Sequence, residues 1–381
     1  KGQAQAAEAG PGMGLGDVDR FSACLRQNNC TELVIVNEAI TGRLPTDLGR
    51  LTTLTRLILN SNSFTGPIPT ELAALQSLVS LQLAYNSITS RLPPGLAALT
   101  ALTELVLHSN DLSGTLPTDF GGLRELVALT IQDSGFTSKL PTELGRLNRL
   151  TRLLASTNGF AGACPTELAM MSALTQLALS RNAFTGPISR ALGPPGLVTL
   201  DVYSNSFTGN LPPEVGQHSQ LTALFAAGNR IGGTIPTEIG SLTRLRRLSL
   251  SDNSMTGSLP EELGELTSLV QLSVDGQYLT GPVPDALGLL PSLTACDLTK
   301  TRAEDVTNRF EHSDAVPNCA FIAADSLLAG PRPGDPVLFP ATNLTVSPAP
   351  SPSKGGGRGD GGNSSASNLA WQRDDPAANL S

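Results

Sequence analysis

The chain has 381 residues, a formal net charge of −8 at pH 7 and 4% aromatic residues. The acidic balance and the absence of a lysine/arginine block argue against binding to nucleic acid. No stretch approaches the roughly 18 consecutive apolar residues of a membrane-spanning helix, so we expect no membrane span within this chain.

The N-terminal residues 1–16 are rich in glycine and alanine, and we expect them to be disordered. The sequence opens at Lys1 rather than at a methionine, so we interpret it as a processed or truncated product. Residues 17–31 are predicted to form an N-terminal cap, in which a short helix turns Phe21 and Leu25 inward.

A regular repeat organises residues 32–298. Its clearest copy runs from Leu54 to Leu75, and leucines in the same phase follow at steps of 24 residues, with one step of 23. The phase-matched leucines are Leu78, Leu102, Leu126, Leu150, Leu174, Leu197, Leu221, Leu245, Leu269 and Leu293. A fixed period of this size predicts stacked structural repeats rather than two or three globular domains.

Within each repeat, an L-x-L pair such as Leu57 and Leu59 alternates with other residues, which is the period of a short strand with one buried face. One such strand per repeat would stack into a parallel sheet. The residues between and beside these leucines would then project from the exposed face of that sheet.

An asparagine recurs three residues after the second strand leucine. It occurs at Asn62, Asn86, Asn110, Asn158, Asn182, Asn205, Asn229 and Asn253, and it is replaced by Glu38, Ser134 and Gln277. Because an amide both donates and accepts, we predict that this row bonds the backbone where each strand ends. We assign it a structural role and no ligand.

Glycine and proline mark the rest of the repeat, as at Gly66 and Pro69. Ser90 and Ser138 replace the glycine, and Ser189 replaces the proline. The repeat containing Ser189 is also the short one, so we expect a local irregularity near 193–196.

The combined motif L-x-x-L-x-L-x-x-N-x-F-T-G-x-I-P-x-x-L-x-x-L, from about Cys30 to Leu298, resembles the plant-specific class of extracellular leucine-rich repeats. Receptor-kinase ectodomains, receptor-like proteins and polygalacturonase-inhibiting proteins contain repeats of this class. The resemblance implies an α/β-type solenoid: a right-handed superhelix of about eleven 24-residue repeats with a parallel concave β-sheet and disulfide-bonded caps.

Four of the five cysteines flank the two ends of the repeats. We predict the pairs Cys24–Cys30 and Cys296–Cys319, because the other pairings would join opposite ends of a rigid rod. The second pair places a C-terminal cap at residues 299–340. Cys164 replaces a core aliphatic residue and is predicted to be a buried, unreactive thiol.

Four N-x-S/T sequons, at Asn29, Asn343, Asn363 and Asn379, are candidate glycosylation sites. Three of them lie near or within the last forty residues, and residues 341–381 read as a disordered tail rich in proline, serine and glycine. Sequons together with paired cysteines predict an extracellular or cell-surface protein that passed through the secretory pathway.

Ligand binding is expected on the concave sheet, where two groups of residues are candidates. The first consists of Arg181, Asp201, Tyr203 and Phe225, because aromatic residues with an arginine are typical of interface anchors, and Tyr85 and His108 are added to it. The second is an apolar strip at Ile58, Val106 and Leu154.

We find no nucleophile with a matching base, no metal-ligand spacing among the histidines and no cofactor motif, so we expect a protein that is not an enzyme. The leading hypothesis is a receptor-like ectodomain that recognises a peptide, protein or glycan on the concave face, together with a co-receptor or the cell-wall matrix. The alternatives are a secreted inhibitor of a cell-wall hydrolase and a structural wall or surface glycoprotein.

Overall fold

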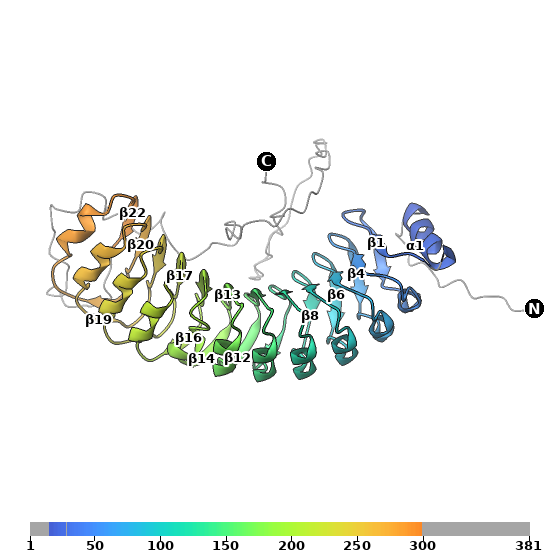
Figure 1. Cartoon of the computed structure of the whole chain (residues 1–381), viewed down its shortest axis with the longest axis horizontal. Helices are drawn as coiled ribbons and strands as arrows, with labels where there is room; N and C mark the ends of the chain where they lie inside the picture. Colours follow the sequence, from blue (N-terminus) through green and yellow to red (C-terminus); the bar gives the residue numbers. More distant parts are fainter. Residues whose placement is uncertain (1–14, 28, 299–381) are drawn as a thin grey trace, which may run out of the picture. The chain divides into compact units, whose positions relative to one another are not determined.

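The computed structural model describes residues 15–27 and 29–298. The chain divides into two compact units, Lys1–Leu327 and Leu328–Ser381, and every described residue belongs to the first. The predicted solenoid is confirmed: successive repeats stack side by side, with one long sheet on the concave side (Figure 1). The predicted tail, the C-terminal cap and residues 1–14 lie outside the described residues.

Twelve strands, one per repeat, form this long parallel sheet. Their bounds are β1 Glu32–Val34, β3 Arg56–Ile58, β5 Ser80–Gln82, β7 Glu104–Val106, β9 Ala128–Thr130, β11 Arg152–Leu154, β13 Gln176–Ala178, β15 Thr199–Asp201, β17 Ala223–Phe225, β18 Arg247–Ser249, β20 Gln271–Ser273 and β22 Ala295–Asp297. Each strand pairs with the same positions of the next, for example Leu177 with Leu200. The described residues therefore contribute one strand more than the expected eleven repeats.

Further strands of two to five residues line a second side of the solenoid. They form the sheets β2-β4-β6-β8, β10-β12-β14-β16 and β19-β21. Their bounds are β2 Thr41–Arg43, β4 Ser63–Gly66, β6 Ser87–Ser90, β8 Asp111–Leu112, β10 Thr137–Ser138, β12 Gly159–Ala163, β14 Ala183–Pro187, β16 Ser206–Thr208, β19 Thr256–Gly257 and β21 Tyr278–Leu279. We call this side the lateral face.

The convex side consists of 3₁₀ helices, one per repeat and most of them five residues long (Figure 1). They are η1 Thr46–Arg50, η2 Thr70–Ala74, η3 Pro94–Ala98, η4 Thr118–Gly122, η5 Thr142–Arg146, η6 Thr166–Met170, η7 Ile188–Ala191, η8 Pro213–Gln217, η9 Thr237–Ser241, η10 Glu261–Glu265 and η11 Asp285–Leu289. A proline in extended conformation precedes each helix, because proline fixes φ and suits the start of a helical turn.

Leucines from all three sides fill the interior, and Leu57, Leu72 and Leu78 are fully buried. Four phenylalanines form a continuous stack through the middle repeats. The ring centroids of Phe136, Phe160, Phe184 and Phe207 lie 6.1, 6.2 and 6.0 Å apart in sequence, and neighbouring rings are nearly parallel. Burial of this continuous core replaces the separate cores of globular domains.

The predicted asparagine row is confirmed. The Asn86 amide donates to the carbonyls of Leu59, Leu83 and Ala84 at 3.0–3.1 Å, and its oxygen accepts from the Phe64 N–H at 3.1 Å. Gln277 makes equivalent contacts with Leu250 and Met255, whereas the shorter Ser134 bonds only to carbonyls through its hydroxyl. Each asparagine thus connects backbone of two adjacent repeats.

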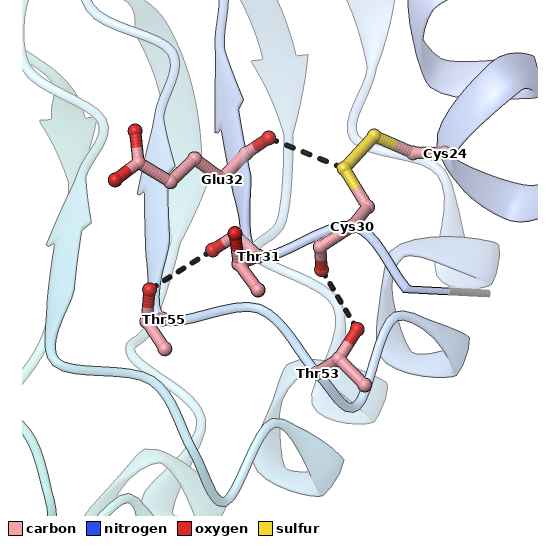
Figure 2. Close-up of a disulfide and its surroundings, with 6 residues drawn as sticks. All are labelled: Cys24, Cys30, Thr31, Glu32, Thr53 and Thr55. Carbon is pink, nitrogen blue, oxygen red and sulfur yellow. Dashed lines mark hydrogen bonds between the residues drawn. A yellow bond between two sulfur atoms is a disulfide. The ribbon is translucent and has the colours of Figure 1, made fainter. Parts of the chain in front are cut away.

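Helix α1 (Leu15–Gln27) covers the first repeat and begins two residues before the expected cap boundary. Phe21 and Leu25 pack against the core, and Cys24 forms the predicted disulfide with Cys30. The Cys30 carbonyl accepts a hydrogen bond of 2.7 Å from the Thr53 hydroxyl, which attaches the cap to the next repeat (Figure 2). Cys296 is also disulfide-bonded, while its predicted partner Cys319 lies outside the described residues.

The expected irregularity occurs in the short repeat. Helix η7 has four residues, and the chain then passes through Gly193 at φ +67°. The ring of His218 lies beside it, with Nδ1 3.2 Å from the Val215 carbonyl oxygen and Nε2 3.1 Å from the Leu192 carbonyl oxygen. His218 occupies the position that holds leucine in most repeats, such as Leu242.

Candidate functional site

The concave sheet presents parallel rows of side chains, because alternate strand residues face the same side and the strands stay in register. The central row consists of the third residue of each strand: Val34, Ile58, Gln82, Val106, Thr130, Leu154, Ala178, Asp201, Phe225, Ser249, Ser273 and Asp297. A second row, two residues later, contains His108, Gln132, Ser156, Ser180 and Tyr203.

The central row is less accessible than the sequence suggests. Asp201 is 4% exposed and Phe225 is 8% exposed, whereas Val34 at the end of the row is 43% exposed. Strands in a sheet lie about 4.8 Å apart, so neighbouring side chains in one row cover each other. The strand pattern of the sequence indicates which residues face outward, but it does not show how side chains in adjacent repeats cover one another.

The two aromatic residues of the first candidate group each lie under an arginine. The Arg181 guanidinium carbon is 5.7 Å from the centre of the Tyr203 ring, and that of Arg247 is 5.2 Å from the Phe225 ring. Both distances fall within the range of cation–π attraction. The sequence alone did not identify Arg247, although it stands one repeat beyond Phe225 in the adjacent row.

Asp201 lies between these pairs and is the most perturbed acid described. Its carboxylate accepts hydrogen bonds from the Ser180 hydroxyl at 2.6 Å and from the Tyr203 N–H at 3.1 Å. Burial raises the pKa of Asp201 to about 6, although both hydrogen bonds and the charge of Arg181 act in the opposite direction. Among the described residues Asp201 has no ion pair.

Tyr85 and His108 form an edge-to-face pair at 4.8 Å in the N-terminal half of the face. Burial lowers the pKa of His108 to about 4, so its imidazole is neutral near pH 7. Its Nδ1 atom is buried without a hydrogen-bond partner. The pair is therefore an uncharged aromatic contact with one buried, unsatisfied nitrogen.

Within the part of the chain that the structure describes, four buried side-chain polar atoms lack a partner, and all four belong to residues of the concave face. They are His108 Nδ1, Gln132 Oε1, Gln176 Oε1 and Ser249 Oγ. Buried polar groups are normally hydrogen-bonded, so these four unsatisfied atoms set the concave face apart from the rest of the described surface. The lateral and convex faces carry none.

Positive backbone φ angles recur where the chain leaves each concave strand. Tyr85 and Arg181 both adopt φ +54°, a left-handed conformation that costs about 1 kcal/mol or more for a side chain of this kind. The equivalent positions in two later repeats are the glycines Gly228 and Gly276, also at positive φ. Tyr85 and Arg181 thus each occupy a strained backbone position directly before an asparagine of the row.

The second candidate group, the apolar strip, is interrupted by polar contacts. Gln82 stands between Ile58 and Val106 in the central row, and its amide donates to a Glu104 carboxylate oxygen at 2.8 Å. Asn60 donates to Gln82 at 2.9 Å. The structure therefore does not bring Ile58, Val106 and Leu154 together as one continuous apolar surface.

The remaining predicted sites are placed as follows. Asn29 is exposed beside the disulfide, whereas Asn343, Asn363 and Asn379 lie outside the described residues. Cys164 is buried, and burial raises its pKa to about 12. No described cluster of three or more His, Cys, Asp or Glu side chains suits a metal ion. A search for helices that could cross a membrane found none among residues 15–27 and 29–298.

Models of the leucine-rich repeat family match residues 52–112, 196–218 and 244–266. Among curated proteins no significant match was found. Solved structures, by contrast, match over most of the described solenoid.

One match is the plant peptide hormone receptor RGFR1, solved in complex with RGF2. The two chains are 32% identical and superpose with a TM-score of 0.69, and the match covers 73% of this chain and 45% of the RGFR1 chain. Another is PEPR1, solved with AtPEP1: 31% identity, TM-score 0.65, with coverage of 72% and 42%. This chain therefore spans less than half the length of either receptor chain. A plant ice-binding protein matches at 31% identity and TM-score 0.56, covering 60% of this chain and 74% of its own.

Proposed function

Because this chain belongs to the leucine-rich repeat family, with the repeat type of plant receptor ectodomains, we propose that it is an extracellular, non-enzymatic protein that binds a peptide on its concave face. The plant peptide hormone receptor RGFR1, solved in complex with RGF2, and PEPR1, solved with AtPEP1, have a fold of the same kind. The Cys24–Cys30 disulfide supports an oxidising, extracellular location.

The observation that carries this proposal is the contrast between the concave face and the other two. The concave face holds every described buried polar atom that lacks a partner, both arginine–aromatic pairs and the acid Asp201 with its raised pKa. Perturbed acids and unsatisfied polar atoms gather at functional sites more often than on structural surfaces.

The dimensions of the face suit a linear ligand. Twelve strands about 4.8 Å apart give a surface roughly 50 Å long. An extended peptide of about twelve residues spans roughly 40 Å at about 3.3 Å per residue. A ligand of this length would contact the Tyr85–His108 pair and the Arg181–Tyr203 pair together.

The test selects 12-residue peptides from a random displayed library on the full chain and measures their affinity by calorimetry. Two variants remove concave contacts: Tyr203→Ala, and Arg181→Asn, which keeps a residue that tolerates positive φ. Tyr278→Ala is the matched control, because Tyr278 is 42% exposed on the lateral strand β21.

We expect each concave variant to weaken binding at least tenfold, as removal of an interface anchor does, with an unchanged melting temperature. Tyr278→Ala should bind within about twofold of the unmodified chain. Equal binding by all three variants would place the ligand elsewhere. Failure to select any peptide, together with inhibition of a polygalacturonase, would favour the hydrolase-inhibitor alternative.

A further inference from the structure

The outward residues of β13 and its flanking strands place several hydrogen-bond acceptors around one small side chain. Ala178 stands in the central row between Leu154 and Asp201, with which it is paired in register. Because alanine carries only a methyl group, the central row has its smallest side chain at this point, between the side chains of Leu154 and Asp201. Gln176 lies two residues before Ala178 on the same face, and Ser180 lies two residues after it.

The acceptors here outnumber the donors. The Ser180 hydroxyl lies 2.6 Å from Asp201 Oδ2 and 2.9 Å from the Ser156 hydroxyl oxygen. Because it carries one proton, it donates to the carboxylate and accepts from Ser156. Gln176 is 8% exposed, and its Oε1 atom has no partner. The site therefore contains a buried carboxylate and a buried amide oxygen whose capacity to accept hydrogen bonds is not filled.

No cation among the described residues neutralises Asp201. On the β13 side, Arg181 lies over the Tyr203 ring; its charge acts on Asp201, but the two form no ion pair. On its own strand the neighbouring ionisable group is Tyr203. On the β17 side, Ala223, Phe225 and Ala227 carry no charge. A buried carboxylate without a partner cation is costly, so this arrangement favours an incoming positive charge.

We propose that Gln176, Ser180 and Asp201, arranged around Ala178, form a subsite for a positively charged group of the ligand, an ammonium or a guanidinium. The proposal rests on the proposed function and adds the chemistry of one ligand side chain. A lysine or arginine of a bound peptide supplies several N–H donors and the counter-charge of Asp201 at once.

The subsite has a built-in dependence on pH. Because burial raises the pKa of Asp201 to about 6, the carboxylate is ionised at pH 7.5 and protonated at pH 4.5. A protonated Asp201 has no charge to attract a cation, and it is a weaker hydrogen-bond acceptor than the carboxylate. We expect affinity for the cation to fall on the order of tenfold or more between these two values.

The experiment uses the full chain labelled with ¹³C at alanine methyl groups and follows Ala178 by NMR. The probes are n-butylammonium and n-butylguanidinium chloride, with uncharged n-butanol as the matched control at constant ionic strength. The variants are Asp201→Asn, which keeps the acceptor for the Tyr203 N–H, and Asp297→Asn, which removes an acid from the other end of the central row.

We expect a saturable shift of the Ala178 methyl signal with both cations at pH 7.5, and none with n-butanol. The shift should disappear at pH 4.5 and in Asp201→Asn, and it should persist in Asp297→Asn. A shift that survives in Asp201→Asn, an equal response to n-butanol, or no saturation at pH 7.5 would each overturn the proposal.

Peptides selected on the concave face separate this proposal from the broader one. If Asp201→Asn leaves their affinity unchanged while Tyr203→Ala reduces it, the concave face binds ligand but the cation subsite is wrong. If neither variant affects binding, the site proposed for the ligand is itself wrong.

Discussion

Asn182 shows how one side chain holds backbone from two repeats. Its amide donates to the carbonyls of Ala155, Leu179 and Ser180 at 3.0–3.1 Å, and its oxygen accepts from the Phe160 N–H at 3.0 Å. Leucine has a similar volume but makes none of these bonds.

We therefore expect Asn182→Leu to lower the free energy of unfolding by about 1–3 kcal/mol, the cost of stranding buried backbone groups. Urea denaturation followed by circular dichroism measures this change. Thr185→Ala, an exposed substitution in the same repeat, serves as the control and should stay within about 0.5 kcal/mol. An Asn182→Leu variant as stable as this control would refute the structural role of the asparagine row.

Asp201 should reveal its raised pKa in the pH dependence of stability. The folded protein holds the proton more tightly than the unfolded chain, because the pKa is about 6 in the fold against an ordinary value of 3.8. The contribution of Asp201 to stability is therefore most favourable below pH 4, falls between pH 4 and 6, and is constant above pH 6.

Asp201→Asn removes the buried charge and keeps the acceptor for the Tyr203 N–H. We expect this variant to be more stable at pH 7.5, by on the order of 2–3 kcal/mol, because a shift of about two pKa units corresponds to that free energy. At pH 4 the gain should be small. Chemical denaturation at both values measures the difference, and an equal effect at the two pH values would show that burial does not perturb Asp201.

At this scale the sequence predicted contacts within the repeating motif and missed those between neighbouring rows. The bonds of the asparagines follow from a residue type at a fixed position, so the pattern was sufficient. The burial of Asp201 and the contact of Arg247 with Phe225 depend on which side chain happens to stand one repeat away. No motif encodes that combination.

Among the elements, the short repeat around η7 is the clearest departure from regularity. The sequence located it from the 23-residue step and from Ser189, but it gave no indication of how the fold accommodates the missing residue. His218 provides part of the answer, because its Nε2 contacts the Leu192 carbonyl where the shortened turn ends. A residue in the following repeat thus compensates for the irregularity.

We predict that His218→Leu, which restores the usual residue of this position, lowers stability by about 1 kcal/mol. The stability gained from an apolar side chain is smaller than the stability lost with the hydrogen bond to buried backbone. Leu242→His is the reciprocal change in a regular repeat, and it should destabilise more strongly, because a buried imidazole there would have no irregular turn to contact. The denaturant midpoints of the two variants measure these changes in stability. If His218→Leu were more stable than the unmodified protein, the hydrogen bond between His218 and the Leu192 carbonyl would not contribute to stability.

For the whole molecule, stacking means that described repeats contact mainly their neighbours, as the order of the long sheet shows. This architecture follows almost entirely from the 24-residue period, since a strand, a turn held by an asparagine and a 3₁₀ helix preceded by proline recur in most copies. Interactions in such an array decay along its length, and local changes stay local.

The disulfide of the N-terminal cap offers a test of this locality. Cys24→Ala with Cys30→Ala opens a loop with a sequence separation of 6 residues, for which chain entropy predicts a loss of about 2 kcal/mol. Helix α1, whose Phe21 and Leu25 pack against the core, would then detach more readily from the first repeat. Hydrogen exchange measured by mass spectrometry should show faster exchange in residues 29–58.

Amides of β13 to β17 should be unaffected, since six or more repeats separate them from the cap. The matched control is Cys164→Ala, which alters a buried free thiol near the centre and should affect exchange only in its own and adjacent repeats. Uniformly faster exchange along the whole sheet in the cap variant would contradict nearest-neighbour stacking and would indicate one fully cooperative unit. Because the concave candidates Arg181 to Phe225 lie in the unaffected part, the cap variant should also retain the affinity of peptides selected on that region.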